Sequence, residues 1–206
     1  MRFKLLVSPI ITVSFLFVAF SATAQVSAPY QGVGLPIRIG GGAAGFEPDW
    51  GHGRMYGGAI WIDWFPKNLP SFLNGFGVEA EARDISFNKH LEHETNPQRS
   101  GQANTKEDTA GGGVIYNVAQ FHNFHPYVKF IVSQGSVDFI TASPTYSHDT
   151  RLVMAPGGGF EYRVYRQMWV RADYEYQRWT STLLGKYLTP SGYTVGITYD
   201  LSHPTR

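Results

Sequence analysis

The residues best suited to chemistry in this chain are the two histidines and two glutamates of His90-Leu91-Glu92-His93-Glu94. Imidazole and carboxylate groups are ligands for zinc or nickel. The HExxH order of a zinc protease is absent, and the surrounding segment is rich in Asn, Gln and Thr, which predicts a solvated loop without fixed ligand geometry. We therefore expect no bound metal or cofactor, and His90 and His93 are the residues that would ligate one.

Two further groups of residues have the right types for catalysis. Ser147-His148-Asp149 contains the members of a nucleophilic triad, but triad partners converge from separate parts of a fold, and these three are neighbours in an expected loop. Glu79 with Glu81, and Asp173 with Glu175, could act as acid and base. Each pair has an arginine two residues away, which favours structural ion pairs. No catalytic residue is predicted.

The first 24 residues have the organisation of a secretory signal peptide. A basic start precedes the apolar run Leu5–Phe20, and the small residues of Ala22-Thr23-Ala24 predict cleavage before Gln25. The alternative is a transmembrane anchor, but the apolar run is shorter than the ~20 residues that a spanning helix needs. We expect a signal peptide over residues 1–24 and one domain over residues 25–206.

The composition argues against several classes of protein. Cysteine is absent, so a disulfide framework or a thiolate metal site is excluded. The formal net charge is +1 without a basic block, which gives no indication of nucleic-acid binding. A mean hydropathy of −0.20 argues against a helical membrane protein, yet it is compatible with membrane strands that alternate polar and apolar residues.

Period-2 alternation of polar and apolar residues predicts strands through the expected domain. In the clearest case, Phe76–Arg83, every second residue is apolar and the residues between them are Gly, Glu, Glu and Arg. The expected strands are Leu35–Phe46, Arg54–Phe65, Phe76–Arg83, Thr109–Val118, Phe124–Gln134, Arg151–Tyr162, Met168–Gln177 and Tyr193–Leu201.

The connections between these strands are of two alternating kinds. The compact ones are Pro66–Gly75, Ala119–Asn123 and Arg163–Gln167, and the mostly longer, more polar ones are Gly45–Gly53, Asn88–Asp108, Gly135–Thr150 and Arg178–Ser191. Short turns at one end and long loops at the other are typical of outer-membrane barrels. The pattern predicts an all-β fold, an eight-stranded antiparallel up-and-down transmembrane β-barrel.

The two faces of the expected strands differ in polarity. One face is apolar, with aromatic residues toward the strand ends, as in a lipid-facing band with aromatic girdles. The other face carries charges of both signs, and the interior of an eight-stranded barrel is just wide enough for side chains. We therefore expect an ion-paired interior and no wide pore. Its members are Arg38, Asp63, Glu79, Glu81, Arg83, Lys129, Glu161, Arg171, Asp173, Glu175 and Asp200.

With this leader, strand count and alternation, and the closing segment GYTVGITYDL (Gly192–Leu201), the chain resembles small outer-membrane β-barrel proteins. The OmpA transmembrane domain, OmpX and the opacity proteins are of this kind. The resemblance implies insertion by the barrel assembly machinery, which reads the last strand, and contact with outer-membrane lipid and lipopolysaccharide. The family ends on an aromatic residue, whereas this chain continues through Ser202–Arg206, so either Tyr199 and Leu201 serve for recognition or assembly tolerates a tail.

The expected function is structural or interaction-based. A monomeric, non-enzymatic barrel in the outer membrane would support envelope integrity, adhesion or binding of a surface partner through its outer loops. Two alternatives stay open. One is a lipid-modifying outer-membrane enzyme, which needs a Ser/His pair near the outer rim. The other is a soluble periplasmic lipocalin-like barrel, whose apolar face would turn inward around a ligand. No nucleic acid is expected as a partner.

Overall fold

A computed structural model of the chain describes residues 35–49, 53–66, 69–87, 104–119, 121–140, 147–180 and 187–202. The expected signal peptide and the histidines His90 and His93 lie outside these ranges. The only helical segment within them is the 3-10 turn η1 (Ser71–Leu73). No helix in the described part is long and apolar enough to cross a membrane.

Strands account for most of the described residues. They are β1 (Ile37–Glu47), β2 (Met55–Trp64), β3 (Phe76–Phe87), β4 (Asn104–Asn117), β5 (Phe124–Ile140), β6 (Ser147–Tyr165), β7 (Met168–Tyr176), β8 (Arg178–Trp179) and β9 (Ser191–Asp200). Only Gln177 separates β7 from β8, and its N–H donates to Pro190 O in the register that β7 keeps with β9. β7 and β8 are therefore one strand of the barrel, which makes eight.

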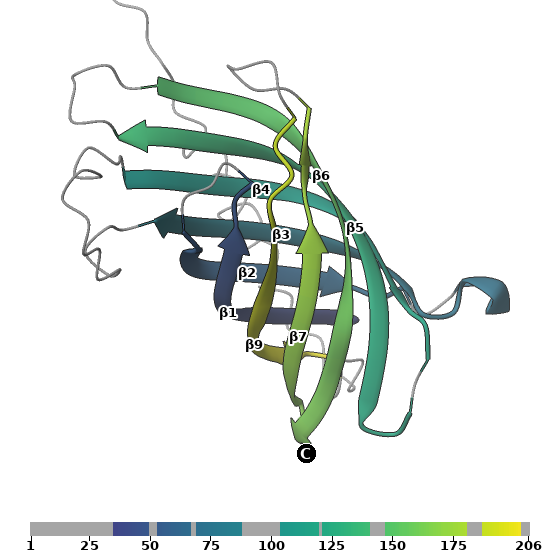
Figure 1. Ribbon diagram of the computed structural model, residues 1–206. Helices are drawn as coiled ribbons and strands as arrows, with labels where there is room; N and C mark the ends of the chain where they lie inside the picture. The colour runs from purple at the N-terminus through teal and green to yellow at the C-terminus, as the bar shows by residue number, and fades with distance from the viewer. Residues whose placement is uncertain are drawn as a thin grey trace, which may run out of the picture. The chain divides into compact units, whose positions relative to one another are not determined.

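Antiparallel pairing closes these strands into a barrel (Figure 1). Strands that follow one another in the sequence are paired, including β5 with β6. The pairing of the last strand, β9, with the first, β1, closes the ring. The pairings can be followed around the barrel in both directions from Ala44 on β1. Through β2, β3, β4 and β5 they lead to Asp149 on β6, and through β9 and β7 they lead to Gly159 on the same strand. The ten-residue offset on one strand is the shear of the barrel, so its strands are steeply tilted.

An apolar belt covers the outside of this barrel. Ile60, at 65% exposed, is one of many exposed apolar residues at alternate positions of the strands. The belt has aromatic residues at its two edges: Trp64 and Tyr116 toward the short turns, Tyr56 and Tyr193 toward the long connections. This arrangement matches the lipid-facing band of an outer-membrane barrel. It also corrects the lipocalin-like alternative, which required the apolar face to point inward.

Four strands are longer than the sequence indicates. β3 continues to Phe87, β4 begins at Asn104 and not at Thr109, β5 continues to Ile140, and β6 begins at Ser147. The predicted loops Asn88–Asp108 and Gly135–Thr150 are therefore too long. The outward face of these strand ends is polar, and apolar residues such as Ile85 and Val137 lie on their inward face, which is the reverse of the pattern in the belt. As a consequence, Ser147-His148-Asp149 lies on the backbone of β6 and not in a loop.

The added strand ends form what we call the outer extension: residues 84–87, 104–108, 135–140 and 147–150 of β3 to β6. In Figure 1 these strands run well past the ends of β1, β7 and β9. The outward residues of the outer extension whose side chains the structure describes are polar or charged, as in the row Asp84, Asp108, Ser136 and Thr150 across the four strands. The outer extension therefore stands clear of the apolar belt.

Candidate functional site

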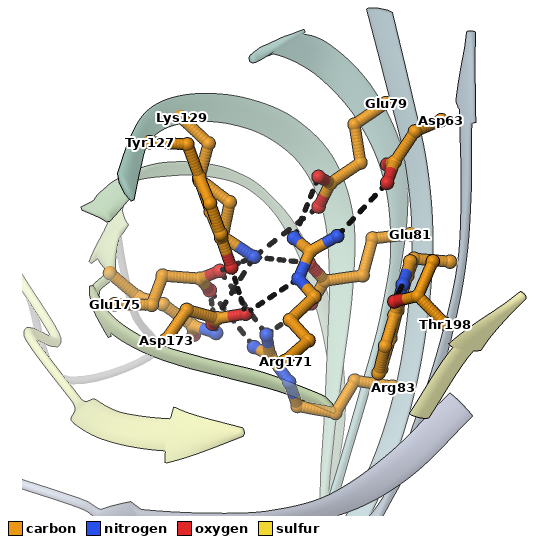
Figure 2. Close-up of polar contacts among 12 residues, drawn as sticks. Asp63, Glu79, Glu81, Arg83, Tyr127, Lys129, Arg171, Asp173, Glu175 and Thr198 are labelled. Carbon is orange, nitrogen blue, oxygen red and sulfur yellow. Dashed lines mark hydrogen bonds and ion pairs between the residues drawn. The ribbon is translucent and has the colours of Figure 1, made fainter. Parts of the chain in front are cut away.

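The barrel interior is occupied by three buried cations among five buried carboxylates (Figure 2). Arg83 comes from β3, Lys129 from β5 and Arg171 from β7. Strand alternation turns these side chains inward, because successive residues point to opposite faces of a sheet. The carboxylates are Asp63, Glu79, Glu81, Asp173 and Glu175.

Arg171 is the central cation and is 0% exposed. Its Nη2 donates to Glu79 Oε2 at 2.7 Å, its Nη1 to Asp63 Oδ2 at 3.2 Å, and its Nε to Asp173 Oδ2 at 3.0 Å. The guanidinium also lies 4.8 Å from the ring centroid of Trp61. Charge-assisted hydrogen bonds and an aromatic face together satisfy a cation that has left water.

Lys129 and Arg83 connect the remaining carboxylates. Lys129 Nζ lies 2.6 Å from Glu81 Oε2, 3.3 Å from Glu79 Oε1 and 3.2 Å from Glu175 Oε2. Arg83 donates to Glu81 and holds both oxygens of Glu175, at 2.9 and 3.2 Å. Because Glu79, Glu81 and Glu175 are each shared between two cations, the network joins β3, β5 and β7 across the interior.

A second group of ion pairs lies toward the short turns. Arg38 Nη1 donates to Glu161 Oε2 at 2.6 Å, and its Nε lies 3.6 Å from Asp200 Oδ2. The same guanidinium packs near the rings of Phe65 and Trp169, at 4.9 and 5.4 Å from their centroids. These groups fill the end of the barrel that carries the short turns.

The structure places all eleven residues expected in the interior network at inward positions, and it brings all of them into ion pairs. Sequence reasoning did not include Tyr127, whose hydroxyl donates to Asp173 Oδ2 at 2.9 Å. It also did not include Gln177, which donates to Glu175 at 3.2 Å and accepts from Trp179 Nε1 at 3.0 Å. Both residues fall on the inward face of their strands by the period of two, so the alternation in the sequence could have identified them.

Apolar side chains fill the interior beyond the ion pairs, toward the outer extension. One cluster contains Ala44, Phe46, Met55, Ala59, Trp61, Ile85 and Phe87, and the other contains Val137, Val153 and Trp179, with Leu188 packed against it. Glycines make room for the indoles: a Cβ on Gly40 would overlap the ring of Trp61, and one on Gly135 would overlap Trp179. The interior is therefore filled by side chains.

The interior residues with suitable types for chemistry have structural partners in this arrangement. Each pair of carboxylates is bound to cations, and the described residues contain no group of three or more His, Asp or Glu that could hold a metal ion. His125 packs against Trp169, with ring centroids 4.5 Å apart. His122 lies in the turn between β4 and β5 with a φ of 46°.

A closed barrel with an apolar belt outside and ion pairs inside defines an integral membrane β-barrel protein of eight strands. The chain belongs to the outer membrane protein beta-barrel domain family, whose model matches residues 10–200. It is thus an outer-membrane β-barrel protein. No curated protein matches it significantly in sequence.

Solved structures of other outer-membrane proteins share the fold. Neisserial surface protein A is 12% identical with a TM-score of 0.57, and the match covers 80% of this chain and 95% of that one. A major outer membrane protein from Thermus thermophilus is 10% identical (TM-score 0.54; 79% and 98% covered). OprG from Pseudomonas aeruginosa is 16% identical (TM-score 0.53; 82% and 97% covered). At these identities the likeness concerns the fold.

Proposed function

We propose that this protein binds a polar partner at the cell surface through the outer extension and the loops that it carries. The outer extension is the observation on which the proposal depends. A strand needs about 9–11 residues to cross a membrane. β5 has 17 residues and β6 has 19, so both continue beyond what insertion requires.

The outward face of the outer extension has the chemistry of a polar contact surface. Lys106 Nζ lies 3.1 Å from Asp84 Oδ2 on the neighbouring strand and 3.1 Å from Asp108 Oδ2 on its own strand. Hydrogen bonds to Asp108 and Asp84 raise the pKa of Lys106, so it stays charged. This acid–base–acid cluster is exposed, where ion pairs contribute little to stability. It is available for recognition.

The filled interior supports the same proposal, because it leaves the outer end as the place for activity. We propose that the barrel has no wide pore. In planar bilayers, the refolded protein should give no conductance steps of the size of a general porin. Large, steady steps would contradict a filled interior.

The binding role is tested in a deletion strain complemented with the wild-type protein or with an Asp84→Ala, Lys106→Ala, Asp108→Ala variant. Attachment of the cells to immobilised glycans and matrix proteins is measured, with dye uptake as the control for envelope integrity. We expect the wild-type protein to restore attachment and the variant to fail, although both insert into the membrane. Equal restoration by both would contradict the role of the outer extension, and a defect in dye uptake alone would favour a purely structural role.

We further propose the partners that assemble and surround the barrel. The barrel assembly machinery would read β9, and outer-membrane lipid and lipopolysaccharide would contact the belt. Export would follow cleavage of the signal peptide before Gln25. Mass spectrometry of the mature protein from the outer membrane tests this cleavage directly, and a mature protein that begins at another residue would contradict the expected site.

We also propose that the protein is not an enzyme. Ser147, His148 and Asp149 are consecutive on β6, whereas a triad needs partners that converge from different segments. Mass spectrometry of lipid A from cells with and without the protein tests this proposal. A change in acyl chains or head group that depends on the protein would favour the lipid-modifying alternative.

A further inference from the structure

Glu107 differs from every other acidic residue of the described interior in its surroundings. It points inward from β4 and is 1% exposed. Neither of its carboxyl oxygens has a hydrogen-bond partner among the described residues. Its outward neighbours Lys106 and Asp108 are charged, so Glu107 lies in the outer extension, above the apolar belt and not within the membrane.

The strands on both sides of Glu107 present apolar residues to it. Its register partners are Ile85 on β3 and Val137 on β5. Ile85 belongs to the apolar cluster around Phe46, and Val137 belongs to the cluster around Trp179. Glu107 therefore lies where the two clusters meet. A carboxylate in such a place keeps its charge only at a large cost, and a proton removes that cost.

The charged groups that act on Glu107 do not supply a free cation. Arg83 on β3 favours its ionised form, but the Nη1 and Nη2 atoms of Arg83 are bound by Glu81 and Glu175, and no hydrogen bond joins Arg83 to Glu107. Three acids oppose ionisation: Glu175 on β7, Asp108 on the same strand, and Asp49 after β1. Asp49 is itself engaged by the amide and hydroxyl of Thr189, each at 2.8 Å. Burial is the largest cause, and together these effects raise the pKa of Glu107 to about 8.

We propose that Glu107 is a proton-binding site through which the pH outside the cell controls the closure of the outer end of the barrel. With the proton bound, the two apolar clusters pack against each other and the outer extension is closed. When the proton leaves, the charged carboxylate draws water between the clusters, and the paired ends of β3, β4 and β5 loosen. The loops carried by these strands then lose their rigid support.

The titration of Glu107 itself is the first test. The full mature chain is refolded in phospholipid vesicles, and the side-chain carboxyl carbons of glutamate are followed by NMR from pH 4 to 10. Glu107 is assigned by the signal that disappears in Glu107→Gln, which keeps size and shape. We expect a midpoint more than two pH units above the value of an exposed glutamate, which is about 4.3. A midpoint near 4.3 would overturn the proposal.

Hydrogen exchange tests the coupling to closure. Amide protection of Ile85, Glu107 and Val137, corrected for intrinsic exchange, should fall at least tenfold between pH 6 and pH 9 in the wild-type protein. It should stay constant in Glu107→Gln. Asp138→Asn is the matched control, because this carboxylate lies on the outward face of the outer extension and is not among the groups that act on Glu107, so the variant should behave as the wild-type protein does. Equal loosening in the wild-type protein and in Glu107→Gln, or no loosening in either, would overturn the coupling.

Discussion

Arg171 on β7 and Glu79 on β3 form an ion pair across the barrel, with 2.7 Å between Nη2 and Oε2. These strands are not neighbours, since β9, β1 and β2 lie between them in the sheet order. The pair therefore passes through the interior and not along the wall. Together with Lys129 and Arg83 it ties opposite sides of the barrel, as Figure 2 shows. The interior network is thus a brace for a barrel without disulfides.

Removal of the central cation should destabilise the barrel strongly. Arg171→Met leaves Asp63, Glu79 and Asp173 without their guanidinium, and breaking a buried ion pair on one side costs about 3–5 kcal/mol. Urea unfolding in phospholipid vesicles measures the loss. The control is Arg54→Met, because Arg54 is 58% exposed and 4.0 Å from Glu47, so its loss should cost about 1 kcal/mol or less. Similar losses in the two variants would mean that the ion pairs contribute little.

The orientation of the two faces predicts how charges on the outside behave. Ile60 lies in the middle of the outward face of β2, so Ile60→Arg places a guanidinium in the bilayer and should cost about 2–4 kcal/mol. Ser86→Arg is the control, since Ser86 lies in the outer extension, and it should change stability by about 0.5 kcal/mol or less. Folding in vesicles followed by gel mobility and urea unfolding gives both values. If Ile60→Arg were harmless, the apolar belt would not face lipid.

Close packing of Gly40 against Trp61 predicts a pair of compensating changes. Gly40→Ala puts a methyl group into the indole ring and should cost about 1–3 kcal/mol by overpacking. Gly41→Ala, one residue further on the outward face, makes only ordinary contacts and should be close to neutral. Trp61→Leu removes the indole and its hydrogen bond to Thr198, so it destabilises on its own. The double variant Gly40→Ala, Trp61→Leu should then be more stable than the sum of the single losses predicts. Urea unfolding of the four proteins measures this difference. Strict additivity would contradict the packing.

Alternation alone predicts the barrel and the inward position of the charged residues. Inside the membrane the two faces of a strand differ in polarity, so a period of two reveals which residues share a face. The choice of partners does not follow from alternation. Lys129 and Glu81 come from strands that are not adjacent, and their contact depends on the tilt and shear of the closed barrel.

The outer extension was missed for a related reason. On β4 above the belt both faces carry polar residues, so Lys106 and Asp108 alternate with Thr105 and Glu107 without a hydrophobic signal. On β3 and β5 the inward residues Ile85 and Val137 are apolar and the outward ones polar, which reverses the pattern seen in the belt. The polarity of β4 hid Glu107, which falls in a predicted loop. Only the pairing of β4 with β3 and β5 shows that this glutamate is enclosed.

Glu107 also predicts how the stability of the barrel depends on pH. Its folded pKa is about 8, whereas an unfolded glutamate has a pKa of about 4.3. Between these values the unfolded chain releases the proton while the folded barrel keeps it, so the contribution to stability is complete below pH 4 and is lost as the pH rises to 8. The loss is on the order of 5 kcal/mol. Glu107→Gln has no proton to lose, so its free energy of unfolding relative to the wild-type protein should rise across this range. Urea unfolding at a series of pH values measures the difference, and other titrating groups cancel in it. Asp138→Asn should show no such rise, and a constant difference for Glu107→Gln would contradict a buried, proton-binding Glu107.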